Sequence, residues 1–240
     1  MPIDPSLLLR AYAIGVFPMA DDRRAREVYW VEPKKRAILP LDRFHLSHSL
    51  ARTIRQGRFR VSVNEDFDGI IRLCAESAPD RPTTWINRDI EASYRRLHQL
   101  GFAHSVECWE GTELVGGLYG VSLGRAFFGE SMVSRRTDAS KVALAWLVAR
   151  MRLAGCTLLD CQFMTEHLRS LGAVEIDRRE YQSLLAEALT GVSLADESAL
   201  LSAGPGPEAE LAFAAELPPA ATVSGPDSGH FISQLLTQTS

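Results

Sequence analysis

The chain has 240 residues, a net charge of −4 at pH 7 and an apolar fraction of 46%, which is enough for a sizeable core in one large domain or two small ones. No apolar run approaches the roughly 18 residues of a membrane span, and no basic segment followed by an apolar one opens the chain. Four cysteines without C-x-x-C spacing favour neither a disulfide framework nor a zinc site, so we expect a cytoplasmic protein without a membrane or metal partner.

The first 57 residues indicate a small N-terminal unit. Asp4 can cap a helix with Pro5 in its first turn and Gly15 at its end, and the proline- and aromatic-rich stretch that follows predicts loops and one strand near residues 37–39. Residues 34–60 carry eight lysines and arginines against one aspartate. Composition alone favours a solvated surface here, and a polyanion partner is the alternative.

Residues 58–190 show regular hydrophobic periodicity and form the second predicted unit. A strand is followed by two amphipathic helices, three antiparallel strands, a long helix, a strand, a short helix, a strand and a final helix. The predicted ranges are 59–63, 65–77, 87–101, 103–110, 113–124, 126–132, 137–155, 157–162, 166–172, 173–176 and 177–189.

This order predicts an α+β fold in which a small N-terminal unit precedes a mixed-sheet domain like that of the N-acetyltransferase superfamily (GNAT-like). In that fold the strands predicted here at 126–132 and 157–162 splay apart, and the gap between them holds the reacting groups. Asp160 and Gln162 are two residues apart, so on a strand their side chains share one face. We expect Glu130 to face this pair across one cleft.

Residues 191–240 carry six acidic residues and no lysine or arginine, and they are rich in Ala, Pro and Gly. This composition predicts a flexible acidic tail. Its last residues, from His230 onward, could form a weak helix or dock on the body.

Several blocks of the chain, in the same order, resemble the leucyl/phenylalanyl-tRNA-protein transferase family: GVFP, TTWINRDI, YRRLHQLGFAHSVECWEGTELVGGLYGV, FFGESMVSRRTDASKVAL and LLDCQFMTEHLRSLGA. The resemblance runs from about Leu7 to Leu189. It implies an enzyme without a cofactor that moves Leu or Phe from aminoacyl-tRNA to proteins beginning with Lys or Arg. The added residue then marks those proteins for degradation by the N-end rule.

The resemblance also implies roles for the polar residues. Asp160 would orient or deprotonate the acceptor amine, and Gln162 would donate to the developing oxyanion or hold the carbonyl. Glu130, after two phenylalanines and a glycine, is expected to be buried and to need a cationic partner. Arg135 could be that partner, but we favour the acceptor's α-ammonium or its basic side chain.

The donor side chain implies a smooth apolar pocket. By resemblance its lining is Leu118, Met132, Leu144, Leu147 and Leu159, all of which could equally be ordinary core. A flexible methionine adapts to branched and aromatic guests, and such pockets discriminate weakly, so Met is expected as a third, weaker donor residue.

The tRNA would be read at its 3′ end and along its backbone. Met19 stands where the family often has Trp, so Trp30 and Trp85 are the candidates to stack on the 3′ adenosine. The residues expected to contact the tRNA phosphates, along one approach to the cleft, are Lys34, Lys35, Arg36, Arg55 and Arg58. We expect a monomer.

Three alternatives follow from the same residues. A CoA-dependent N-acetyltransferase shares the fold order, but the turn SRRTDAS before the long helix lacks the glycine that would cradle a pyrophosphate. A catalytically silent tRNA-binding module would tolerate changes at Asp160 and Gln162. A related enzyme class transfers Leu to N-terminal Asp or Glu, against which the acidic Glu130 argues.

Overall fold

The computed structural model describes residues 1–76, 83–192, 200–202, 204–213 and 228–237. It has the expected α+β architecture: a small N-terminal region with a two-stranded sheet, and a mixed sheet of seven strands in the order β4-β5-β6-β7-β8-β3-β9. All neighbours in the large sheet are antiparallel except β7 and β8, which run parallel. In the described part of the chain, no helix has both the length and the apolar character to cross a membrane.

The N-terminal region begins with α1 (Pro5–Ala13), whose cap Asp4 accepts a hydrogen bond from the Leu7 N–H at 3.0 Å, as expected. Two short strands lie where loops were expected, β1 (Phe17–Met19) and β2 (Tyr29–Val31). The 3-10 turn η1 (Leu41–Arg43) and the helix α2 (His48–Arg55) lie at and beyond the end of that stretch, where no specific element was predicted. The expected strand near 37–39 is β3 (Lys35–Ile38). It lies inside the large sheet, between β8 and β9, so that sheet draws strands from both sides of the predicted boundary at residue 57.

The second region follows the predicted order closely. Its elements are β4 (Arg60–Val63), α3 (Phe67–Ala75), α4 (Arg88–Gln99), β5 (Ala103–Glu110), β6 (Glu113–Leu123), β7 (Ala126–Ser134), α5 (Ala139–Ala154), β8 (Leu158–Asp160), α6 (Glu166–Ser170), β9 (Val174–Asp177) and α7 (Arg178–Ala188).

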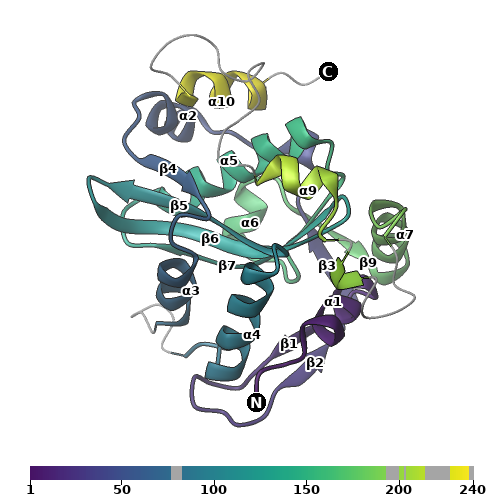
Figure 1. Ribbon diagram of the computed structural model, residues 1–240. Coiled ribbons are helices and arrows are strands. Elements are labelled where there is room, and N and C mark those ends of the chain that lie inside the picture. The colour runs from purple at the N-terminus through teal and green to yellow at the C-terminus, as the bar shows by residue number, and fades with distance from the viewer. Residues whose placement is uncertain (77–82, 193–199, 203, 214–227, 238–240) are drawn as a thin grey trace.

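Helices cover both faces of the sheet (Figure 1). On one face α1, α3, α4 and α7 pack around Tyr12, Tyr94 and Phe128 in the first core cluster. On the other face α2, α5 and α6 pack around Leu144 and Leu159 in the second. The sheet therefore has buried side chains on both faces, and any group that lies between β7 and β8 is within reach of both helix layers.

The described parts of the C-terminal segment pack on the body. Helix α9 (Pro207–Ala212) lies against α5, and the ring of Phe213 stacks on His104 at 4.0 Å between centroids. Helix α10 (Ser228–Thr237) lies against α2 and α5, as Figure 1 shows, with Ile232 and Leu236 buried. These parts differ from a loose tail because several of their large apolar residues are buried: Leu200, Phe213, Ile232 and Leu236. The rest of the predicted tail, 193–199, 203, 214–227 and 238–240, lies outside the described residues.

Candidate active site

The site begins where β7 and β8 separate. The two strands pair in parallel only as far as Phe128 and Asp160, after which β8 ends and β7 continues. This is the splay that the fold order led us to expect. It leaves the side chains after Phe128 in β7 without a neighbouring strand on one side.

Glu130 is placed by a β-bulge. Along β6, Tyr119 pairs with Ser131 and the next residue, Gly120, pairs with Gly129, so Glu130 is an extra residue in β7. A bulge of this kind redirects side chains on one strand. The Glu130 carboxylate reaches the helices on the first face of the sheet, while Met132 packs with the second core cluster. Strict alternation would have put the two side chains on the same face.

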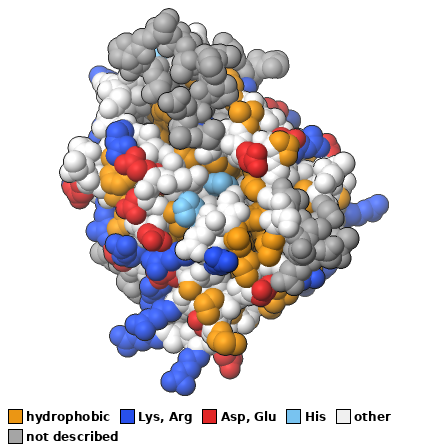
Figure 2. Space-filling model, in the orientation of Figure 1, with side chains coloured by type: hydrophobic (Ala, Val, Ile, Leu, Met, Phe, Trp, Pro, Cys, Tyr) orange, Lys and Arg blue, Asp and Glu red, His pale blue; other side chains and the backbone are white. Residues whose placement is uncertain are grey.

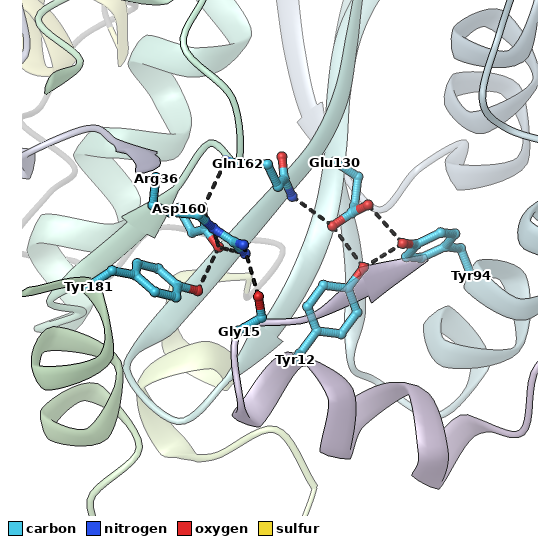
Figure 3. A network of polar contacts seen from close by, with 8 residues as sticks. All are labelled: Tyr12, Gly15, Arg36, Tyr94, Glu130, Asp160, Gln162 and Tyr181. Atoms are coloured by element: carbon cyan, nitrogen blue, oxygen red, sulfur yellow. Dashed lines mark hydrogen bonds and ion pairs between the residues drawn. The ribbon is translucent and has the colours of Figure 1, made fainter. Parts of the chain in front are cut away.

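The predicted strand through Gln162 is wrong beyond Asp160. Gln162 has a φ of 54°, in the left-handed region, so the strand face that the two residues were expected to share does not exist. They are joined instead by the turn itself, because the Gln162 backbone N–H donates to Asp160 Oδ1 at 2.8 Å. The Gln162 side chain then turns toward Glu130, and its Nε2 donates to Glu130 Oε1 at 3.0 Å (Figure 3).

Asp160 is enclosed by hydrogen-bond donors. Arg36 binds both of its oxygens, from Nε to Oδ1 at 2.9 Å and from Nη2 to Oδ2 at 2.6 Å, and the Tyr181 hydroxyl donates to Oδ2 at 2.9 Å. Asp160 is 0% exposed and Arg36 is 1% exposed. Arg36 also donates to the Gly15 carbonyl at 2.9 Å. The expectation that Arg36 would meet tRNA phosphates on the surface is therefore corrected, since its guanidinium is buried as the partner of Asp160.

Glu130 has polar neighbours without charge. Tyr12 donates to Oε1 at 2.8 Å and Tyr94 donates to Oε2 at 2.7 Å. Burial raises the pKa of Glu130 to about 7, although the hydrogen bonds from Tyr94 and Tyr12 favour its ionised form. The alternative partner for Glu130, Arg135, is excluded, because Arg135 forms an ion pair with Glu76 instead.

An apolar pocket of about 410 Å³ opens beside these groups, within the usual size range of small-molecule sites. It is lined by all five residues expected for the donor side chain: Leu118, Met132, Leu144, Leu147 and Leu159. Glu130 and Gln162 also line it, with Phe163 and His167, whereas Asp160 does not. Sequence reasoning missed Phe163 and His167.

The two expected aromatic residues lie around the β1–β2 hairpin. Trp30 is in β2, opposite Pro18 of β1, and is 42% exposed. The Trp85 carbonyl accepts a hydrogen bond from the Ala20 N–H at 3.2 Å, just after β1. Strand β1 reaches the pocket through Phe17, whose ring meets Phe163 edge-on at 5.7 Å.

The basic residues expected along one approach lie at two separate places. Lys34 and Lys35 are exposed at the start of β3, whereas Arg55 and Arg58 are exposed beside β4. These strands are first and sixth in the sheet, which separates them by about 24 Å, and Figure 1 shows α2 and β3 on opposite sides of the molecule. The expectation of one shared approach is therefore wrong, because the chain crosses the sheet between the two groups.

A different group of arginines gathers in the N-terminal region. Arg23, Arg24, Arg26 and Arg88 line a shallow hollow there, together with Met1 and Asp89. On the face in Figure 2, Lys and Arg side chains are densest toward the lower left and the base. Sequence reasoning missed this hollow because Arg88 comes from a distant part of the chain.

Tyr12, Tyr94 and the buried role of Arg36 were also missed. The two tyrosines lie on the apolar faces of predicted helices, where an aromatic residue is ordinary core. A signal was available in the hydroxyl groups, because a buried carboxylate at Glu130 requires hydrogen-bond donors and buried tyrosine is one source of them.

Two family models match the chain. The one described as "Leucyl/phenylalanyl-tRNA protein transferase" matches residues 38–186, and the one for the N-terminal domain of the same family matches residues 1–34.

Curated relatives agree with these matches, and each is named leucyl/phenylalanyl-tRNA–protein transferase. A protein of Rhizorhabdus wittichii is 59% identical over 99% of both chains. A protein of Zymomonas mobilis is 62% identical over 78% of this chain and 70% of its own. One of Cereibacter sphaeroides is 60% identical over 79% and 86%. The chain belongs to the leucyl/phenylalanyl-tRNA protein transferase family.

Proposed function

We propose that this enzyme moves Leu or Phe, and more weakly Met, from aminoacyl-tRNA to the N-terminal Lys or Arg of acceptor proteins, marking them for N-end rule degradation. It acts as a monomer in the cytoplasm. One observation carries the proposal: an apolar pocket ends at a buried carboxylate and an amide, Glu130 and Gln162. That combination suits an ester with an apolar side chain that is attacked by an amine.

The apolar part of the pocket holds the donor side chain. Leu118 of β6, Met132 of β7 and Leu159 of β8 form its sheet side, and Leu144 and Leu147 of α5 close it. The thioether of Met132 can adapt to a branched or a flat guest. A mainly apolar lining discriminates weakly between apolar side chains, by about 1–3 kcal/mol per methylene, so Leu, Phe and Met can all be accepted.

The polar end of the pocket meets the ester carbonyl and the acceptor amine. Gln162 uses its Nε2 to bind Glu130, so its amide oxygen can accept a hydrogen bond from the amine. Asp160 does not line the pocket and acts through its contact with the Gln162 backbone N–H. Its contribution is to hold the left-handed turn that points Gln162 at the substrate.

The tRNA leaves the pocket along β1 and β3. Trp30 and Trp85 are the proposed stacking partners of the 3′ adenosine. Lys34 and Lys35 are the proposed phosphate contacts, because β3 is joined to the site by Ala37, whose N–H donates to the Gln162 carbonyl at 3.1 Å. Arg55 and Arg58, which lie beside the edge strand β4, are left out of this surface.

The test is a transfer assay with radiolabelled leucyl-tRNA and a model protein that begins with Arg. We expect label to appear in the protein, and we expect none when its α-amine is acetylated. A parallel reaction supplies labelled acetyl-CoA in place of the tRNA. Label from acetyl-CoA would favour the N-acetyltransferase alternative, and tRNA binding without transfer would favour the silent binding module.

A further inference from the structure

Two carboxylates lie at the centre of the site, and only one of them can exchange a proton with a substrate. Asp160 is surrounded mainly by groups that donate hydrogen bonds and cannot accept them. The Arg36 guanidinium and the Gln162 backbone N–H are donors in any protonation state. A proton added to Asp160 would find an acceptor only at Tyr181, and it would weaken the ion pair with Arg36.

Glu130 has different surroundings. Its partners Tyr12 and Tyr94 are also hydrogen-bonded to each other, so the carboxyl and the two hydroxyls form a closed ring of contacts. A hydroxyl can donate and accept. When Glu130 is ionised, both hydroxyls donate to it. When it is protonated, it can donate to Tyr12, which donates to Tyr94, which donates back to the other carboxyl oxygen. The protonated state thus makes all three contacts of the ring, and the ionised state makes the two contacts to the carboxylate, so the ring can accommodate an added proton by rotation of a hydroxyl hydrogen.

From this contrast we infer that Glu130, and not Asp160, takes the proton of the attacking amine, with Tyr12 and Tyr94 as the residues that position it and accommodate the proton. The inference rests on the proposed function. Glu130 lines the pocket and Asp160 does not, so only Glu130 can meet a substrate atom directly.

Charged and titratable groups reach Glu130 from several elements. The groups that influence the pKa values of Glu130 and of its partner Tyr94 are Tyr12 of α1, Arg36 of β3, Tyr94 of α4, Tyr119 of β6 and Asp160 of β8. Burial is the largest influence and raises the pKa of Glu130; the two hydroxyls lower it, Asp160 raises it and Arg36 lowers it, with a result of about 7. Glu130 can thus give and take a proton near neutral pH, which is what an acid–base group needs.

Glu130 can carry one proton from the attacking amine to the leaving 3′ oxygen. The acceptor enters as a neutral amine, which an α-amino group with a pKa of about 7.7–8.0 supplies near pH 8. Its nitrogen forms the new C–N bond to the ester carbonyl carbon, and one N–H proton passes to Glu130. The bond from that carbon to the tRNA 3′ oxygen then breaks, and Glu130 returns the proton to this oxygen. The products are an amide and a tRNA with a free 3′ hydroxyl.

The tyrosine hydroxyls provide the test. Tyr94→Phe removes a donor that stabilises ionised Glu130 more than protonated Glu130, since hydrogen bonds to a charged group are about twice as strong. The pKa of Glu130 should therefore rise by about one unit. The pH midpoint of the single-turnover transfer rate should move upward by about 0.4 units, because the acceptor amine, with a pKa of about 7.7–8.0, titrates in the same range. At a pH one unit below the wild-type midpoint, Tyr94→Phe should transfer several-fold more slowly than the wild type. At high pH its rate should approach the wild-type plateau. Tyr12→Phe should move the midpoint in the same direction.

The matched control is Tyr181→Phe, which removes a buried hydroxyl from Asp160 instead. Its midpoint should equal that of the wild type, and the acceptor amine titrates identically in all variants. An unchanged midpoint in Tyr94→Phe and Tyr12→Phe, or an equal shift in Tyr181→Phe, would overturn the inference. If one tyrosine variant does not fold, the other carries the same test. Failure of the wild type to transfer at any pH would contradict the proposed function itself, which is a distinct result.

Discussion

Replacement of Glu130 by Gln should change how the stability of the protein depends on pH. A glutamate has a pKa near 4.5 when exposed, and burial raises that of Glu130 to about 7 in the folded protein. Between these values the folded protein binds a proton that the unfolded chain has lost. The stabilising contribution of protonated Glu130 is therefore complete below pH 4.5 and is lost as the pH rises through 7.

The size of this loss follows from the same two values. Each unit of difference in pKa corresponds to about 1.4 kcal/mol, so the rise from 4.5 to about 7 corresponds to about 3 kcal/mol of unfolding free energy. Glu130→Gln keeps the size and the hydrogen-bonding shape of the side chain but cannot ionise. The unfolding free energy of the variant minus that of the wild type should thus increase by about 3 kcal/mol between pH 4.5 and pH 8.

Urea unfolding at several pH values, followed by the fluorescence of the four tryptophans, measures this difference. Other titrating groups are common to the two proteins and cancel in the subtraction. A difference that stays constant within about 1 kcal/mol would refute the reasoning, because it would mean that Glu130 titrates like an exposed carboxylate. Asp160→Asn is the contrasting variant: it leaves Arg36 buried without its counter-ion and should cost about 3–5 kcal/mol.

Two further predictions concern the substrates. Met132→Ala should enlarge the pocket and raise the ratio of phenylalanyl to leucyl transfer, measured with both tRNAs in competition; an unchanged ratio would place the donor side chain elsewhere. Lys34→Ala combined with Lys35→Ala should weaken binding of leucyl- and phenylalanyl-tRNA equally and reduce the slope of log affinity against log salt by roughly 0.7–0.9 per lost phosphate contact. Arg55→Ala combined with Arg58→Ala removes the same charge beside the edge strand β4 and should leave that slope unchanged, and equal slopes in the two double variants would contradict the assignment.

The order of the elements was predictable because each one obeys a local period. The strands and helices from residue 59 to 189 alternate in the predicted order, and Gly155 ends α5 with a φ of 77°, as a helix-ending glycine should. The N-terminal region was harder to predict. Strands β1 and β2 have three residues each, which is too short for a periodic pattern to emerge.

The three polar residues of the site were also found from the sequence, but their contacts were not. Periodicity assumes regular strands, whereas Glu130 occupies a bulge and Gln162 a left-handed turn. Both irregularities change which way a side chain points. Gly129 beside Glu130 is the kind of strand glycine that often accompanies a bulge, whereas the residues around Gln162 contain no comparable marker. Tyr12 and Tyr94 are 82 residues apart, so only the packing of α1 against α4 could bring their hydroxyls together.

The division of roles between the two carboxylates follows from a count of charges. The buried network in Figure 3 contains two carboxyl groups, Glu130 and Asp160, and one cation, Arg36. Two buried anions with one counter-ion are costly, and a proton on one of them removes the excess charge. The guanidinium of Arg36 pairs with Asp160, because its Nε and Nη2 bind both oxygens of that carboxylate. A proton taken up by this network therefore goes to Glu130, the carboxyl that faces the pocket and whose hydroxyl partners can accept as well as donate.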